Sequence, residues 1–310
     1  MPHSAEQAPS PEKYIHHIID LAKSHVRDTD EYRELMGRGG KSQAEAFRKV
    51  ARDVASQEKS ELSEADRALL RVTGELGVYV QTEHELTQIY GGAEDRYLDS
   101  DEKQTARHLK TEYAIPFNHH LKEFINTHPN DDIRTVSSAL TNAYGTIFGR
   151  YECIDRKEMI YQQAPQPREA FEYIQASLDG MRHEVAAESL LEAADYSFDF
   201  RVSSEEDARG ADLFVYLESG WEAVDVKASQ LSASKAHSQN RFSRAVWTGL
   251  DWGDFTGQKG TGHGMLSIPF ATADAKCDQF IGNIRQMVTS QQAQRAAARQ
   301  HAGNKSLRYS

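Results

Sequence analysis

The segment from Gly210 to Gln230 constrains the fold of this 310-residue chain more than any other. Two apolar runs within it flank the dipeptide Ser219-Gly220, which suits a tight turn. The pattern predicts a β-hairpin. Because side chains alternate between the two faces of a strand, Asp225 and Lys227 share one face of the second strand.

The turn also predicts a register for the hairpin. A two-residue Ser-Gly loop pairs Glu218 with Trp221 and, counting back, Asp212 with Lys227. Asp212 then lies on the same face as Asp225 and Lys227. Two carboxylates held close together repel each other unless a cation lies between them, and Mg²⁺ takes oxygen ligands of this kind. The segment therefore predicts a metal site that could hydrolyse a phosphodiester, with the lysine at the phosphate.

A third carboxylate can come from a helix that the sequence predicts between Gly180 and Ala194. Glu184, Glu188 and Glu192 follow one another at steps of four, so they line one side of that helix. We favour Glu184 as the site residue and keep Glu188 as the alternative.

Taken in order, several features of this region resemble the PD-(D/E)XK nuclease superfamily, which includes many restriction enzymes and archaeal Holliday-junction resolvases. The features are Gly180, Glu184, the turn at Asp195-Tyr196, Arg201, Asp212 and Asp225-Val-Lys227. The resemblance covers Gly180 to Gln230 in detail. One departure is Ala211, which stands where the family name places a proline.

The resemblance implies roles for individual residues. Asp212 and Asp225 would bind Mg²⁺ or Mn²⁺, and Glu184 would be a third ligand, direct or through water. Lys227 would orient the nucleophile, and Gln230 resembles an auxiliary glutamine that some members carry. The implied protein is a metal-dependent endonuclease that acts on nucleic acid, most simply DNA, in restriction, defence or recombination.

The chain divides by pattern into two parts and a tail. The pattern of residues 1–165 predicts an α-helical domain of unknown role. The helices of this domain could bind a protein partner. Residues 166–290 predict an α/β domain with a restriction-endonuclease-like mixed sheet flanked by helices, and residues 291–310 a frayed tail. The strands expected in the second part are Phe198 to Val202, Asp212 to Leu217, Trp221 to Ala228 and Met265 to Phe270, with a helix over 235–250 and a closing helix from Ala273.

Aromatic and basic residues alternate in the segment 241–263. Arg241, Arg244, Trp247 and Lys259 are candidates for nucleic-acid contacts, together with Trp252. The same residues could instead belong to a helix that packs on the sheet and to the glycine-rich loop after it. The sequence leaves both interpretations open.

Composition bounds these expectations. The net charge of −11 is unusual for a nucleic-acid enzyme, so a local basic surface or a bound metal must offset it. Cys153 and Cys277 have no metal-ligand spacing and are expected to be free thiols. No apolar stretch is long enough to span a membrane, so we expect a cytoplasmic protein, with a homodimer as one possible state.

Three alternatives remain beside the nuclease. Acid-x-Lys occurs four times in the chain, so Asp225-Val-Lys227 could be an ordinary ion pair on an edge hairpin. The domain could also keep the fold without the chemistry and act as a nucleic-acid-binding or assembly module. A nucleotide-binding loop at residues 37–42 would need a strand before Gly37, where the pattern predicts a helix.

Overall fold

The computed structural model describes residues 11–37, 43–57, 61–90, 100–127, 133–148, 167–239, 242–255 and 266–306. Two compact units divide the chain, and the division falls between Met181 and Arg182. This division lies inside one continuous helix, α8 (Pro167–Ala193). Residue 165, where the sequence predicts the boundary, lies outside the described residues. No helix among the described residues combines the length and the apolar character that a membrane span requires.

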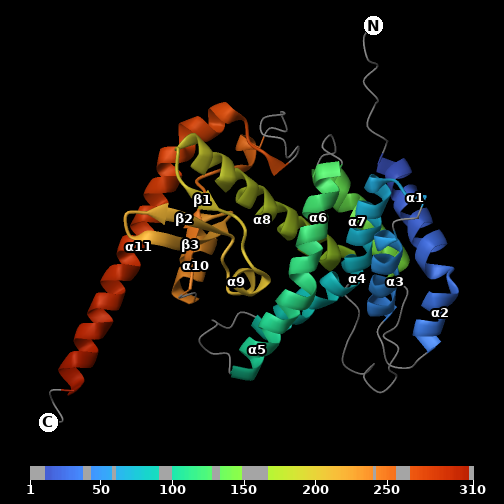
Figure 1. Cartoon of the computed structure of the whole chain (residues 1–310), viewed down its shortest axis with the longest axis horizontal. Helices are drawn as coiled ribbons and strands as arrows, with labels where there is room; N and C mark the ends of the chain where they lie inside the picture. The colour runs from blue at the N-terminus through green and yellow to red at the C-terminus, as the bar shows by residue number, and fades with distance from the viewer. Residues whose placement is uncertain are drawn as a thin grey trace, which may run out of the picture. The chain divides into compact units, whose positions relative to one another are not determined.

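The first unit is helical throughout its described part, as the sequence predicts (Figure 1). Its elements are α1 (Pro11–Ala22), η1 (Lys23–Arg27), α2 (Asp30–Gly37), α3 (Gln43–Ser56), α4 (Glu64–Tyr90), α5 (Ser100–Leu109), η3 (Lys110–Ala114), α6 (Ile115–Thr127), α7 (Ile133–Ile147) and the start of α8. A helix precedes Gly37, so the strand that a nucleotide-binding loop needs is not there. Residues 38–42 lie outside the described part of the chain.

Small residues on α4 let its neighbours approach closely. A Cβ on Gly74 would come within 2.8 Å of Ala51 on α3, and one on Gly77 would come within 2.7 Å of the Phe148 ring. Glycine is therefore required at both positions, because neither contact leaves room for a side chain. The ring of Phe148 in turn packs edge-on against Phe47, at 5.2 Å between centroids.

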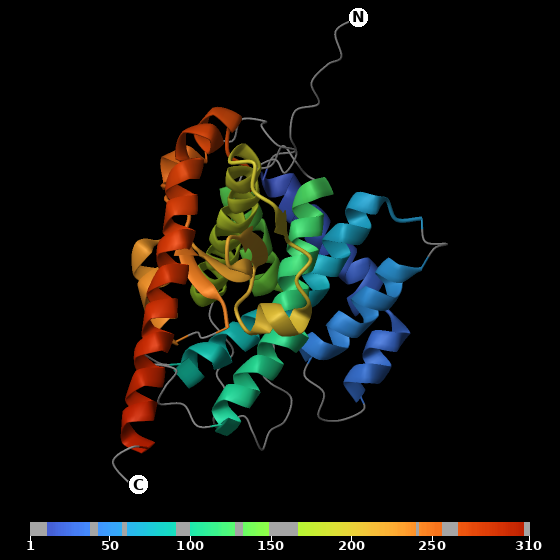
Figure 2. The ribbon, with the colours of Figure 1, turned by 60° about the vertical axis from the view of Figure 1, so that its left-hand side comes forward.

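The second unit contains a four-stranded sheet, which Figures 1 and 2 show beside α11. After the end of α8 come β1 (Phe198–Asp199), α9 (Ser204–Ala208), β2 (Leu213–Leu217), β3 (Gly220–Lys227), α10 (Gln230–Gln239), β4 (Arg244–Trp247), η4 (Trp252–Asp254) and α11 (Phe270–Ser306). The sheet order is β1-β2-β3-β4. The first three strands are antiparallel, and β4 runs parallel to β3 after the α10 crossover, as a parallel pair requires.

One face of the sheet packs on α8 and α11. The buried cluster combines the apolar residues of α8 from Ala186 to Leu191 with alternate strand residues such as Val224 and Val226. From α11 it takes residues between Ala273 and Val288. Because Val224 and Val226 face this cluster, Asp225 and Lys227 lie on the other face of β3.

Two expected elements are wrong. The segment 235–250 was expected to be helical, but Arg244–Trp247 forms β4, in which Ala245 and Val246 are buried. So short an apolar run does not distinguish a helix from a strand by its period. Met265 lies outside the described residues, and Leu266 to Pro269 form no strand, because the proline lacks an N–H and its carbonyl accepts from Thr272 N at the start of α11.

The hairpin forms, but its register differs from the expected one. Leu217 pairs with Gly220, so the loop is Glu218-Ser219, and Gly220 takes a positive φ of 102°. The pairing is therefore shifted by two positions along the strand. An even shift keeps every side chain on its predicted face, so Asp212 still lies on the side of Asp225.

The last helix extends into the segment that was predicted as a tail. α11 continues as helix to Ser306, whereas a frayed tail was expected from residue 291. Cys277 on this helix is a free, buried thiol, as expected, and Cys153 lies outside the described residues.

A buried carboxylate joins two helices of the first unit. The Glu75 side chain on α4 has no exposed surface. One of its oxygens accepts from Nε of Arg52 at 2.6 Å, and the other forms an ion pair with Nε of Arg48 at 2.7 Å, both arginines being on α3. Arg48 also donates to the carbonyl of Glu112 at 2.7 Å. The two guanidinium groups together compensate the buried charge, and their bonds hold α3 against α4.

We therefore expect Glu75→Gln to reduce the free energy of unfolding by about 3–5 kcal/mol, because it leaves two arginines without their anion. Urea denaturation of the full chain measures this change. The control is Glu64→Gln, since the Glu64 side chain is 74% exposed and pairs with Arg71 at 3.3 Å. The control should cost about 0–1 kcal/mol, and equal costs for both variants would contradict the argument.

Candidate active site

Asp225 and Lys227 form an ion pair on one face of β3. The carboxylate of Asp225 is 5% exposed and contacts the ammonium group of Lys227, whose side chain is 31% exposed. A charged carboxylate in a buried strand is costly unless a cation compensates it. The pair is therefore more than a solvated surface salt bridge, which is the simplest interpretation that the sequence left open.

Asp212 lies beside Asp225, at the point where β2 begins. Its backbone N–H donates to the Val224 carbonyl at 2.8 Å, and its Oδ2 accepts from the backbone N–H of Val226 at 2.6 Å. Asp212 thus binds the residues on both sides of Asp225. The bond from Val226 fixes the direction of the Asp212 carboxylate and satisfies an amide at the end of the ladder.

The third carboxylate comes from α8 and is that of Glu184. Burial would lower the pKa of Lys227, but the negative charges of Asp225, Asp212 and Glu184 outweigh burial and raise that pKa above its usual value. Three acidic side chains therefore act on one ammonium group, one from β3, one from α8 and one from the residue before β2. Because Lys227 stays protonated at neutral pH, it can stabilise a phosphate but cannot take a proton as a general base.

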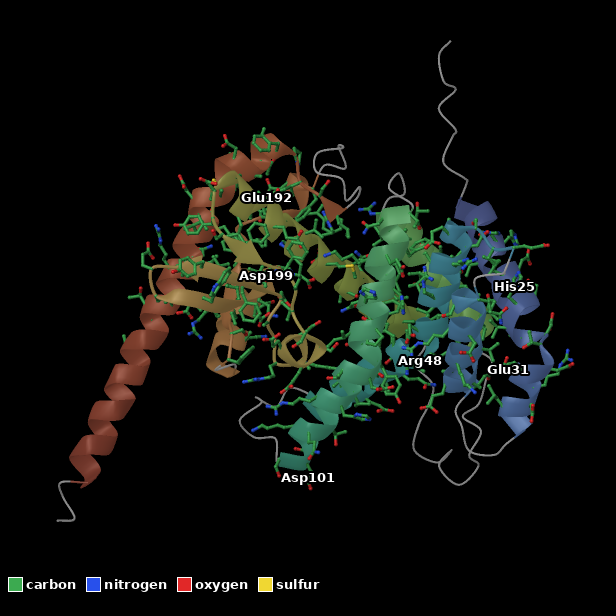
Figure 3. The ribbon with its side chains drawn as sticks, viewed as in Figure 1. His25, Glu31, Arg48, Asp101, Glu192 and Asp199 are labelled. Atoms are coloured by element: carbon green, nitrogen blue, oxygen red, sulfur yellow. The ribbon has the colours of Figure 1, made fainter. Side chains whose placement is uncertain are left out.

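The other residues predicted for the site lie in different surroundings. Gln230 is exposed in the first turn of α10, and Glu192 is exposed near the end of α8, where Figure 3 labels it. Glu188 is half-buried one turn after Glu184. The structure thus places Asp212, Asp225 and Lys227 side by side, and Glu184 acts on Lys227 through its charge.

Two of the residues predicted to contact nucleic acid, Arg244 and Trp247, belong to β4. Arg244 is 6% exposed and donates to Glu222 at 2.8 Å, so its charge is internal and it presents no basic surface. Trp247 is half-buried at the end of β4, where it pairs with Lys227 in register. Arg241 and Lys259 lie outside the described residues.

A buried hydrogen bond that the sequence did not suggest joins α8 to Thr248, the residue that follows β4. Nδ1 of His183 and Oγ1 of Thr248 are 2.8 Å apart. His183 precedes Glu184, and the backbone N–H of Thr248 donates to the carbonyl of Lys227 at 3.4 Å. This bond therefore fixes the helix that carries Glu184 relative to the strand that carries Lys227.

Chemically, the carboxylates suit a hard divalent cation. The side-chain oxygens of Asp212, Asp225 and Glu184 are the ligand type that Mg²⁺ prefers. In their present positions, no three acidic, histidine or cysteine side chains of the described residues are grouped closely enough to hold a metal ion. The donor chemistry thus fits a metal site, while the spacing would have to tighten around it.

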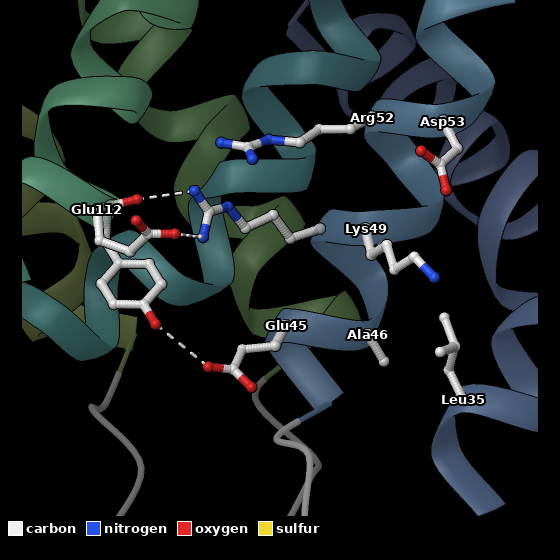
Figure 4. Close-up of a pocket in the computed structure, with 9 residues that line it drawn as sticks. Leu35, Glu45, Ala46, Lys49, Arg52, Asp53 and Glu112 are labelled. Carbon is white, nitrogen blue, oxygen red and sulfur yellow. Dashed lines mark hydrogen bonds and ion pairs between the residues drawn. The ribbon is translucent and has the colours of Figure 1, made fainter. Parts of the chain in front are cut away.

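A separate hollow of about 400 Å³ lies in the first unit (Figure 4). Its walls include Arg48, Lys49, Arg52, Glu45 and Glu112. The dashed contacts in Figure 4 join Arg48 to Glu112 and the Tyr113 hydroxyl to Glu45, at 3.3 Å in the latter case. Its charges largely compensate one another, and it contains none of the residues predicted for catalysis.

Comparison with known proteins adds no relative. The chain matches no family model, no curated protein and no solved structure. The functional interpretation therefore depends on the residues and geometry of this chain alone.

The His183–Thr248 bond gives a prediction for stability. Thr248→Val keeps the shape but removes the hydroxyl, so a buried imidazole nitrogen loses its partner, and we expect a loss of about 1–3 kcal/mol in the free energy of unfolding. Thermal and urea unfolding measure it. The matched control is Thr289→Val on the exposed face of α11, which should change the free energy of unfolding by less than about 0.5 kcal/mol. If the Thr248→Val protein were as stable as this control, the His183–Thr248 bond would not contribute to stability.

The pKa of Lys227 gives a prediction for pH dependence. A lysine whose pKa is raised by folding contributes stability that is fully present below its unfolded pKa and is lost as the pH rises through the folded pKa. The usual value is 10.5, so the stability difference between wild type and Lys227→Met should stay constant to about pH 9 and shrink only above 10.5. Urea denaturation across this range tests it, and a difference that vanishes below about pH 9 would mean that folding lowers this pKa.

Proposed function

We propose that the second unit is a metal-dependent nuclease that hydrolyses phosphodiester bonds, with DNA as its substrate. The observation that carries the proposal is the buried ion pair of Asp225 and Lys227, beside which the Val226 amide holds the carboxylate of Asp212. The negative charge of Glu184 on α8 also acts on Lys227. An ion pair that served only to stabilise the hairpin would need one carboxylate. Three acidic groups around one retained cation leave negative charge that a divalent metal would balance.

The arrangement of the sheet supports the same proposal at the level of the fold. α8 precedes a three-stranded antiparallel meander, and α10 then crosses over to a fourth strand parallel to the third. This order is the one expected for a restriction-endonuclease-like core. We therefore propose that fold for the second unit, with α8 as the helix that supplies the acidic residue.

Each residue then has a definite task. The carboxylates of Asp225, Asp212 and Glu184 would hold Mg²⁺ or Mn²⁺, which, when bound, polarises the phosphate and lowers the pKa of water. Lys227 keeps its proton and donates to a non-bridging phosphate oxygen, where negative charge grows in the transition state. Asp212 is held in position by the Val226 amide, so its carboxylate does not have to be reoriented during the reaction.

Hydrolysis itself needs only water as the second reactant. A water oxygen forms a bond to phosphorus, the bond from phosphorus to the leaving sugar oxygen breaks, and the leaving oxygen gains a proton. Lys227 does not accept the water proton, because it is already protonated. That proton must go to solvent or to a carboxylate of the site.

The test is cleavage of supercoiled and linear DNA with Mg²⁺ or Mn²⁺. We expect Asp225→Asn and Lys227→Met to reduce the cleavage rate by at least about 100-fold, because each removes a charge at the reacting phosphate. The control is Lys103→Met in α5, which alters another acid-x-Lys tripeptide, placed on a helix. It should cleave like the wild type.

The outcome also decides between the nuclease and an inactive protein with the same fold. Cleavage that survives Asp225→Asn would assign the activity to another site or to a contaminant. If the wild type neither cuts DNA nor binds Mn²⁺ in calorimetry, the second unit is a binding or assembly module. In that case Asp212 and Asp225 serve only to order the hairpin.

A further inference from the structure

An exposed tryptophan is held in a fixed orientation near the end of the sheet. Trp252 is 56% exposed, and its ring packs over the guanidinium of Arg182, which lies 4.1 Å from the ring centroid. The same guanidinium lies 3.9 Å from the ring centroid of Phe255. Arg182 is only 2% exposed, so a buried cation supports the inner side of an exposed indole.

The turn that carries Trp252 is braced at both ends. Asp254 accepts from the backbone N–H of Asp251 at 2.7 Å and from Nζ of Lys276 at 2.6 Å. The same ammonium group donates to the carbonyl of Gly249 at 3.2 Å. These bonds tie η4 to α11, so the indole is presented by a rigid support and not by a free loop.

The residues on either side of Trp252 in the chain are exposed. A Cβ placed on Gly253 would meet no atom of the described residues within 4 Å, and Asp251 is exposed. An apolar peptide side chain would need an apolar groove, which this single ring does not provide. A flat π-system stacked on the indole needs only the ring face, and a nucleobase has that shape.

Trp252 also lies within reach of the candidate site. The backbone N–H of Thr248 donates to the Lys227 carbonyl, and Trp252 follows four residues later. Consecutive Cα atoms are about 3.8 Å apart, so the Cα atoms of Thr248 and Trp252 are separated by at most about 15 Å. A nucleic-acid strand covers that distance in a few nucleotides, at about 3.4 Å each when stacked.

We propose that Trp252 is a stacking platform for an unpaired nucleobase, on a strand that passes the cluster of Asp212, Asp225, Glu184 and Lys227. The choice of a nucleic acid as ligand rests on the proposed function, whereas binding at Trp252 requires no cleavage. Stacking on an aromatic face is indifferent to sequence. The platform therefore selects single-stranded or unpaired segments over a duplex in which every base is already stacked.

The experiment measures binding without cleavage. A short labelled single-stranded oligodeoxynucleotide is titrated in EDTA with the full chain carrying Asp225→Asn, and fluorescence anisotropy gives the Kd. Adding Trp252→Ala should weaken binding by about tenfold, while Trp252→Phe, which keeps a ring, should stay within about threefold of the parent. The duplex of the same sequence should show no such dependence on Trp252.

Trp221→Ala is the matched control, because Trp221 is a second exposed tryptophan, 55% exposed, in the hairpin. Its ring packs on that of Tyr216, with 5.4 Å between the ring centroids. It should leave the Kd unchanged. Equal losses for Trp221→Ala and Trp252→Ala, no loss for Trp252→Ala, or no binding by the parent would each overturn the platform. Binding that depends on Trp252 in a protein that never cuts DNA would overturn the nuclease and leave the platform standing.

Discussion

The second unit depends on the charge of Asp225, a carboxylate in the middle of a buried strand. A charge in that position is tolerated only when a cation lies against it, and Lys227, two residues further along β3, is that cation. The alternation of the strand makes this possible, since it puts both side chains on one face and leaves Val224 and Val226 to the core. The alternation that pairs Asp225 with Lys227 is thus also what allows the strand to be buried.

The sequence predicted the face of this cluster better than its register. The position of the loop was misjudged because Ser219-Gly220 suits a turn, whereas Gly220 is used for its positive φ as the first residue of β3. The error moved the pairing by an even number of positions, so Asp212, Asp225 and Lys227 kept their common face. An error of one position would have placed Asp212 on the core side and removed the argument for a site.

What could not be predicted depends on contacts between distant segments. The run Arg244–Trp247 is too short for its pattern to distinguish a strand from a helix, and β3 supplies the partner with which it pairs as a strand. The same holds for Arg182 and His183, which stand in a mainly buried stretch of α8 and find partners in Trp252 and Thr248. Two polar residues within an apolar helical segment were the only signal, and they did not indicate which residues they contact.

The two margins of the sheet have a consequence for assembly. β1 has only two residues, and at the other margin the Trp247 carbonyl of β4 already accepts from the side-chain amide of Asn283 on α11, at 3.0 Å. A second molecule that tried to extend the sheet would find a very short ladder at one margin and an occupied acceptor at the other. Strand addition between copies is therefore disfavoured at these two margins, which protects the fold from edge-to-edge aggregation.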